Sequence, residues 1–301
     1  AAQLNAIHLQ ESFWLQAATA PDELRQRMKF ALSEIFVIST SDANIDVRGA
    51  ASYYDMLGAN AFGNFRTLLE QVSLHPMMGI YLTHLANQKE DTATGRHPDE
   101  NYAREVMQLM TIGLFQLNAD GTVKLDGAGQ PSATYTQDDI SNLAKVFTGF
   151  SWYSPAPSSN TFLGRGRDPN SSVRSMIAYP TFHSTSAKTF LGTTIPASAT
   201  ADPTGDLKIA LDTLFNHPNV GPFISRQLIQ RMVTSNPSAA YVGRVSAVFA
   251  NNGSGVRGDL AAVARAILTD PEARDTATAG GATYGKLREP AKFVARIRDR
   301  A

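Results

Sequence analysis

The amino-acid sequence predicts an all-α fold: one multi-helix globular domain over residues 1–301, with a small β-hairpin after the central helix and a long irregular excursion at about 151–201. Three observations predict this class. Apolar residues recur at helical spacing over most of the chain, strand signals are scarce, and no internal repeat or low-complexity tract divides it. With 43% hydrophobic residues in 301, the chain is long enough to bury a substantial core.

The composition excludes several classes of protein and of site. The 27 Lys+Arg balance the 27 Asp+Glu, so the basic excess typical of nucleic-acid binders is missing. Without cysteine the chain has no disulfide, no thiolate zinc site and no cysteine nucleophile. No apolar run approaches the roughly 18 residues of a membrane span. Carboxylates and histidines are therefore the most plausible reactive groups.

Amphipathic helices are predicted along most of the chain. In residues 21–36, Leu24, Met28 and Leu32 recur every four residues, and two acidic residues occupy the first turn, at the positive end of the helix dipole. The same spacing predicts helices over residues 3–17, 49–57, 64–74, 76–87, 98–115, 136–148, 205–216, 219–234, 238–250, 258–269 and 287–299.

The hairpin is predicted within residues 114–135, where Asn118, Asp120 and Gly121 form a turn between apolar pairs. Asn118, Asp120 and Thr122 alternate as the ligands of a calcium loop do. Counted from Asn118, however, the glycine comes two places early for an EF-hand, and the twelfth position is Gly129 instead of a bidentate glutamate. We therefore expect a plain β-turn.

The excursion at 151–201 is rich in Ser, Thr, Pro and Gly, and it is too long for an idle connection, so we expect a functional segment or a lid. Trp152 and Tyr153 at its start are predicted to stack on sugar rings, with a hydrophobic anchor as the alternative. His183 lies in the same stretch. A scaffold can bring such a loop histidine over a pocket as acid, base or ligand.

The central helix at 98–115 carries a polar strip. Asn101, Glu105 and Gln108 follow one another at helical spacing, beside the apolar stripe of the helix that is expected to face the core. Met107 and Ile112 lie well away from that stripe, which predicts packing on more than one side of the helix. The carboxylates of this helix are then at least partly buried.

Glu105 is the candidate general acid. Glu100 and Arg104 form a favourable i,i+4 pair, whereas Glu105 has only the amides of Asn101 and Gln108 as helical neighbours. A half-buried carboxyl group without a fixed cation tends toward a raised pKa, as a general acid requires. The alternative is that the strip is a structural hydrogen-bond network.

The remaining catalytic roles are assigned around Glu105. Asp139 or Glu100 is the second carboxylate, although helix capping explains one of the two acids at positions 138 and 139. We expect Asn101, Arg104 and Tyr135 to orient substrate, with His183 closing from the excursion. A metal site built from His97, Asp99 and His183 has no supporting spacing, so no metal and no cofactor are predicted.

Several motifs together resemble one bacterial family, catalogued as domain of unknown function 1800. The longest is the central-helix motif at 99–113, in which many relatives carry Glu where this chain has Gln108. The others are residues 27–36, 75–82, 87–91, 117–122, 135–139, 146–149, 182–183 with Lys188, and 286–290.

The resemblance implies an exported protein, since members of this family typically carry export signals and are often encoded beside a sulfatase-like protein. A periplasmic or extracellular location is therefore expected, with the sulfatase-like protein as a partner. The resemblance implies no reaction. From the residues, the hypothesis is a carboxylate-based, glycosidase-like hydrolase acting on an extracytoplasmic polymer such as a polysaccharide. The alternative is a non-catalytic exported binding or assembly protein acting with the sulfatase-like partner.

Overall fold

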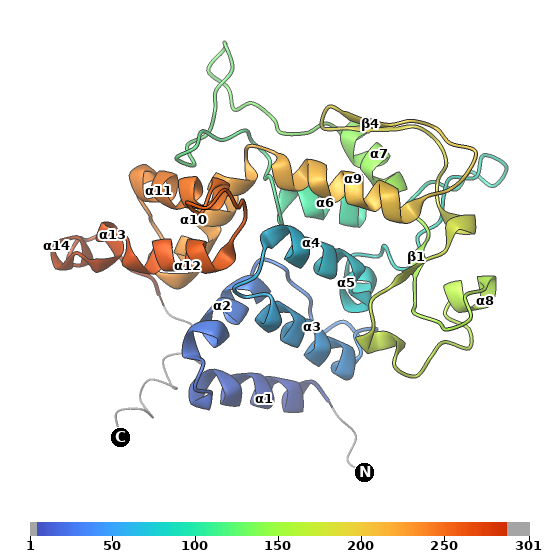
Figure 1. The fold of residues 1–301 in the computed structure, drawn as a ribbon, viewed down its shortest axis with the longest axis horizontal. Helices are drawn as coiled ribbons and strands as arrows, with labels where there is room; N and C mark the ends of the chain where they lie inside the picture. Colours follow the sequence, from blue (N-terminus) through green and yellow to red (C-terminus); the bar gives the residue numbers. More distant parts are fainter. Residues whose placement is uncertain (1–4, 288–301) are drawn as a thin grey trace.

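Helices are the dominant regular structure of residues 5–287, the part of the chain that the computed structural model describes, which confirms the predicted all-α class (Figure 1). The helices are α1 (Ala6–Thr19), α2 (Glu23–Ser33), α3 (Val47–Ala59), α4 (Phe65–Leu74), α5 (Pro76–Tyr81), α6 (Asn101–Gln108), α7 (Gln137–Val146), α8 (Ser159–Phe162), α9 (Pro203–Asn216), α10 (Val220–Met232), α11 (Ala239–Ala250), α12 (Leu260–Thr269), α13 (Pro271–Arg274) and α14 (Thr276–Ala279). The predicted helix at 287–299 lies outside the described residues.

Two small antiparallel sheets and two 3-10 turns complete the secondary structure of the described residues. They are β1 (Phe150–Ser151) paired with β2 (Ile177–Ala178), β3 (Lys188–Phe190) paired with β4 (Thr193–Ile195), η1 (Ser171–Val173) and η2 (Pro180–Phe182). Both sheets fall within the predicted excursion, which is therefore more regular than its sequence suggested.

The core is formed by apolar faces from most of the helices. α9 packs against α4 on one side and α7 on the other, and α10 packs on α11 and α2 (Figure 1). The central helix α6 packs on α7 and buries Tyr102, Val106 and Met107 completely. Met107 and Ile112 are both fully buried, which confirms that this segment is packed on more than one side.

The central helix is shorter than predicted and ends at Gln108. The backbone N–H of Met110 donates to the carbonyl of Glu105, and the N–H groups of Ile112 and Gly113 donate to that of Met107. These wider turns satisfy the last carbonyls of the helix, and Gly113 adopts a φ of +72°, which favours glycine. The chain therefore leaves the helix axis two turns earlier than its periodicity indicated.

The predicted helix at 76–87 is also wrong in its second half, because α5 ends at Tyr81. Thr83 and Ala86 have φ angles of 61° and 60°, in the left-handed region that non-glycine residues rarely adopt. The chain turns there instead, and the backbone N–H of Ala86 donates to the carbonyl of Phe150. This contact brings the segment after α5 next to β1.

The predicted hairpin after the central helix is present as three short extended segments. Isolated bridges join Leu117 to Val123, Leu125 to Pro131 and Phe115 to Ala133, so each segment pairs with the other two. The Asp120 carboxylate accepts hydrogen bonds from the backbone N–H and hydroxyl of Thr122, and Gly121 has a φ of +78°. This is the expected turn, with its carboxylate used within the turn itself.

Candidate functional site

The residues of the polar strip of α6 become less exposed from the N-terminal end of the helix onward. Asn101 is exposed, whereas Glu105 and Gln108 are half-buried. The backbone N–H of Asn101 donates to the Asp99 carboxylate at 2.9 Å, which also accepts from the hydroxyl of Thr83. The strained turn at Thr83 is therefore tied to the first turn of α6.

Glu105 has the environment that its sequence neighbours predicted. Its Oε2 atom is buried and has no hydrogen-bond partner within the described protein. Burial raises the pKa of the Glu105 carboxyl group, and the positive charge of Arg104 opposes this only in part. A half-buried carboxyl group that keeps its proton to a higher pH than an ordinary glutamate is suited to donate that proton.

Two of the predicted orienting residues lie beside Glu105. The hydroxyl of Tyr135 donates to Oε1 of Gln108 at 2.9 Å. Burial raises the pKa of Tyr135, with Arg104 opposing and Glu105 adding to the shift, so the charges of all three groups interact. The structure therefore brings Glu105, Arg104, Gln108 and Tyr135 together.

Glu100 links α6 to α7. Its Oε1 accepts from the hydroxyl of Ser141 at 2.6 Å, and its Oε2 accepts from the side-chain amide of Gln137 at 2.7 Å. Arg104 forms its ion pair with Glu100, at 3.5 Å, as the i,i+4 spacing predicted. The cation nearest in sequence to Glu105 is thus shared with another carboxylate.

Asp139 caps α7 and braces the β3–β4 turn. Its Oδ2 accepts from the backbone N–H and hydroxyl of Thr136, and its Oδ1 accepts from the backbone N–H of Leu191, all at 2.7 Å. Burial acts to raise the pKa of Asp139, but these hydrogen bonds outweigh it and hold the pKa below its usual value. Capping therefore accounts for Asp139 itself, while Asp138 is exposed.

The prediction that Trp152 stacks on sugar rings is wrong. This side chain is only 6% exposed, because it belongs to the apolar core and its ring is covered by the Arg167 guanidinium, 4.4 Å from the ring centroid. Tyr153 is half-buried, and Arg174 lies over its ring at the same distance. Trp152 is therefore an anchor for the excursion, the alternative weighed from the sequence, and offers no open face for a sugar ring.

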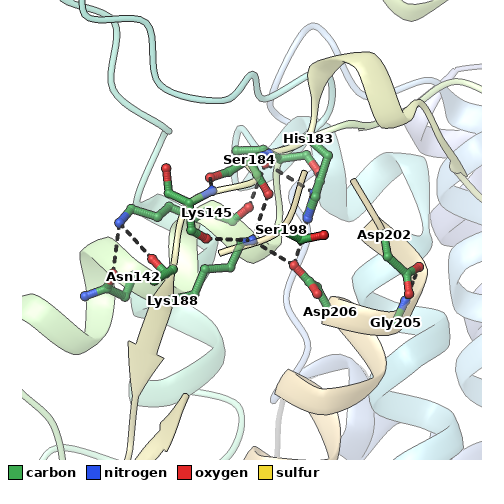
Figure 2. A network of polar contacts seen from close by, with 12 residues as sticks. Asn142, Lys145, His183, Ser184, Lys188, Ser198, Asp202, Gly205 and Asp206 are labelled. Atoms are coloured by element: carbon green, nitrogen blue, oxygen red, sulfur yellow. Dashed lines mark hydrogen bonds and ion pairs between the residues drawn. The ribbon is translucent and has the colours of Figure 1, made fainter. Parts of the chain in front are cut away.

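His183 also requires a correction, because it is fully buried and does not close over α6. Its Nδ1 donates to the backbone carbonyl of Thr148 at 2.7 Å, and its Nε2 lies 3.0 Å from Oδ2 of Asp206 (Figure 2). Both ring nitrogens face oxygen acceptors inside the protein. His183 therefore holds the excursion against the end of α7 and the first turn of α9.

A buried polar network extends from His183. Lys188, 1% exposed, places Nζ 2.8 Å from the same Asp206 oxygen and donates to the backbone carbonyls of Ser184 and Ser186 (Figure 2). The hydroxyls of both serines donate to the Glu90 carboxylate. This network joins four segments that are distant in sequence, and His183, Lys188 and Asp206 within it are buried.

Sequence reasoning missed most of this network. Asp206 carried no signal beyond that of an acid in the first turn of a helix. Glu90 and Lys188 stood inside the motifs that carry the family resemblance, as did Thr148, and that was the only available indication.

Two open cavities lie away from Glu105. One, of about 690 Å³, is lined by residues of α13, α14 and the segments beside them, including Glu272 and Asp275. The other, of about 500 Å³, lies between the β3–β4 turn and the end of α9, and is lined by Asp212 and His217 among others. Glu105 lines neither of these cavities.

Two further properties of residues 5–287 concern metal binding and membrane insertion. No group of three or more His, Asp or Glu side chains there is arranged to hold a metal ion. His97, Asp99 and His183 are not gathered, because His183 is committed to Thr148 and Asp206. In the same range, none of the helices has the length and apolar character needed to cross a membrane.

Comparison with known proteins gives one match. The family model described as "Protein of unknown function (DUF1800)" matches residues 2–299, nearly the whole chain. No curated protein and no solved structure matches.

Proposed function

The chain belongs to the DUF1800 family, and, because that family has no assigned function, we propose a reaction from the site itself: a carboxylate-based hydrolase acting on an extracytoplasmic polymer such as a polysaccharide. The observation that carries the proposal is the state of Glu105. This carboxyl group is half-buried, one of its oxygens has no hydrogen-bond partner within residues 5–287, and its pKa is raised by burial. Those are the properties of a general acid.

In the proposed reaction Glu105 protonates the leaving oxygen of a glycosidic bond while a water molecule attacks the anomeric carbon. A second carboxylate takes the proton of that water or stabilises the positive charge on the sugar. We assign this role to Glu100 in preference to Asp139. The partners of Glu100 are side chains that a substrate can displace, whereas Asp139 is held by the backbone N–H groups of Thr136, just before α7, and Leu191 in the β3–β4 turn.

The residues around Glu105 have orienting roles in this proposal. Arg104 and Tyr135 interact electrostatically with Glu105, and exposed Asn101 offers an amide to a sugar hydroxyl on the same strip. We propose a periplasmic or extracellular location, supported by the export signals typical of the family. Fractionation of cells that express the complete gene tests this location, and recovery in the cytoplasm alone contradicts it.

A second candidate function is a non-catalytic exported binding or assembly protein that acts with a sulfatase-like partner. The observation that favours it is the apolar surface of the segment after α6. Leu114, Phe115 and Leu125 are 50%, 42% and 61% exposed, and large exposed apolar side chains gathered on one segment are typical of a docking surface. In that case the polar strip of α6 only stabilises the fold.

The test is a hydrolysis screen of wild-type protein against defined polymers: peptidoglycan, chitin, dextran, polygalacturonate and dextran sulfate. New reducing ends and released oligosaccharides are measured by mass spectrometry. The hydrolase proposal expects the E105Q variant to lose at least about 100-fold of the rate, the usual contribution of a general acid. The matched control is E11Q, which changes an exposed glutamate of α1.

The outcomes separate the two candidates. Full turnover by E105Q refutes the assignment of Glu105. Release of no product from any polymer by the wild-type protein refutes the hydrolase and leaves the binding or assembly protein.

A further inference from the structure

The segment between β1 and β2, residues 152–176, forms a surface lobe of fixed shape. The β1–β2 pairs Phe150–Ala178 and Ser151–Ile177 close its base. Phe162 ties the lobe to the rest of the protein: its ring stacks on Phe182 with centroids 3.8 Å apart, and its carbonyl accepts from the hydroxyl of Ser151 at 2.6 Å. A braced loop of this kind presents its surface groups in fixed positions.

The lobe carries a net positive charge. It contains three arginines, Arg165, Arg167 and Arg174, against the single acid Asp168, which gives it a net charge of +2 in a protein of net charge zero. All three arginines are exposed. Among residues 5–287, none of the ion pairs involves any of them. Their charges are therefore available to a ligand.

Two of these arginines are held in place by aromatic rings. Arg167 lies over Trp152 and Arg174 over Tyr153, each with its guanidinium carbon 4.4 Å from the ring centroid. A guanidinium group that stacks on a ring keeps its N–H edge free for bidentate hydrogen bonds to carboxylate, sulfate or phosphate. Because the side chain is already ordered, less conformational entropy is lost on binding.

A fourth arginine reaches the edge of the lobe from α3. The Nη2 atom of Arg48 donates to the side-chain oxygen of Asn170 at 3.1 Å. The acid closest to it in sequence, Asp46, caps α3 through the backbone N–H of Gly49. The Asp168 carboxylate in turn accepts from the backbone N–H of Asn170, so both acids have partners within the protein.

We propose that this lobe, with Arg48, is a binding surface for an anionic polysaccharide, a sugar chain that bears repeated carboxylate or sulfate groups. The arginines match the acid groups, and the exposed polar side chains of the lobe match the sugar hydroxyls. The exposed polar residues of the lobe are Ser158, Ser159, Asn160, Asn170 and Ser175.

Nucleic acid fits this surface less well. Bases of single strands stack on open aromatic faces, but Trp152 is buried and Tyr153 is covered by Arg174. The proposal rests on the proposed function only for the choice of a polysaccharide as the polymer. Binding at the lobe does not require Glu105, and the two claims are tested separately.

The test is a binding titration with three probes: dextran sulfate, polygalacturonate and neutral dextran, the last sharing its sugar backbone with the first. The expected result is binding of one or both acidic polymers and not of dextran. Binding of dextran sulfate alone assigns sulfate as the recognised group, binding of polygalacturonate alone assigns carboxylate, and binding of both assigns the charge they share.

The decisive variant is R167Q/R174Q, which is expected to weaken binding roughly tenfold or more. It should also lower the slope of log affinity against log salt concentration by about two, one for each arginine removed. R27Q/R265Q, which removes two exposed arginines outside the lobe, is the matched control and should bind as wild type. R165Q serves as a second variant that leaves both ring contacts intact, and it should weaken binding without altering the melting temperature.

Three outcomes overturn the proposal. They are equal affinity of R167Q/R174Q and wild type, equal binding of dextran and dextran sulfate, and tighter binding of duplex DNA than of either acidic polysaccharide. The E105Q variant is expected to bind like wild type. If E105Q also keeps full hydrolytic activity, the proposed reaction fails while the binding surface stands.

Discussion

The buried network around Asp206 makes the sharpest prediction about stability, through the D206N variant. Asparagine keeps the shape of the side chain but removes the negative charge. One carboxylate oxygen of Asp206 lies 2.8 Å from Nζ of Lys188 and 3.0 Å from Nε2 of His183. After the substitution, Lys188 retains only neutral acceptors within the network: the backbone carbonyls of Ser184 and Ser186 and the amide oxygen of the new side chain.

The expected loss follows from the burial of both partners. Asp206 and Lys188 are 9% and 1% exposed, so solvent cannot replace the missing charge. Removal of one partner from a buried ion pair typically costs about 3–5 kcal/mol of unfolding free energy. The neutral acceptors that remain around Lys188 place the loss for D206N near the lower end, at about 3 kcal/mol, which lowers the melting temperature by about 5 °C in a chain of this size.

The measurement is urea unfolding together with thermal melting, both followed by far-UV circular dichroism. The double variant K188M/D206N removes both charges, and its loss should be at least about 1 kcal/mol smaller than the sum of the single losses. D138N, at an exposed position of α7, is the matched control and should stay within about 0.5 kcal/mol of wild type. A D206N loss below about 1 kcal/mol, or strict additivity of the pair, refutes the account of a coupled buried ion pair.

Three further predictions concern single residues. Because burial raises the folded-state pKa of Glu105, the wild type loses stability as pH rises from the unfolded value of about 4.5 through the folded value, whereas E105Q does not. The free energy of unfolding of E105Q relative to wild type should therefore be higher at pH 7.5 than at pH 4. An E105Q variant that is less stable than wild type only at neutral pH contradicts this. The G149A variant should lose roughly 1–3 kcal/mol of unfolding free energy because an alanine is strained in the left-handed backbone conformation of this position. The loss should be larger still because the new Cβ would lie 2.9 Å from the backbone N of His183. A melting temperature equal to that of wild type contradicts this close contact. D139A removes the cap of α7 and the contact to Leu191, so chemical denaturation should show a loss of roughly 1–2 kcal/mol of unfolding free energy. This loss should disappear as pH falls through the depressed pKa of Asp139 in the folded state. A loss that is unchanged at acid pH contradicts the role of the Asp139 charge.

The sequence was sufficient for the features that depend on local spacing. Helical periodicity located the longer helices of the described residues, and the neighbours of Glu105 at i−4 and i+3 predicted a half-buried carboxyl group with a raised pKa. The i,i+4 pair of Glu100 and Arg104 was predicted for the same reason. These contacts are fixed by the geometry of a single helix, so a single sequence suffices to find them.

Features that depend on distant segments were not predictable in this way. The end of α6 is set by the wider turns that close on Glu105 and Met107, and apolar spacing carries no trace of them. The position of His183 is set by Asp206, a residue of α9 whose place in a first helical turn already had a generic explanation. Trp152 looked like a loop aromatic because nothing in the sequence indicated that an arginine would cover it.

The central claim is that Glu105 donates the proton in a hydrolytic reaction, and the alkaline limb of the pH–rate profile tests it most directly. On the polymer identified by the screen, kcat/KM of the wild type should fall with a midpoint that matches the NMR titration of the Glu105 carboxyl group, above the ordinary glutamate value. E105Q, folded and at least as stable at neutral pH, should lack the activity and with it the limb. An E105Q rate equal to wild type, or an alkaline limb unrelated to the titration of Glu105, contradicts the claim.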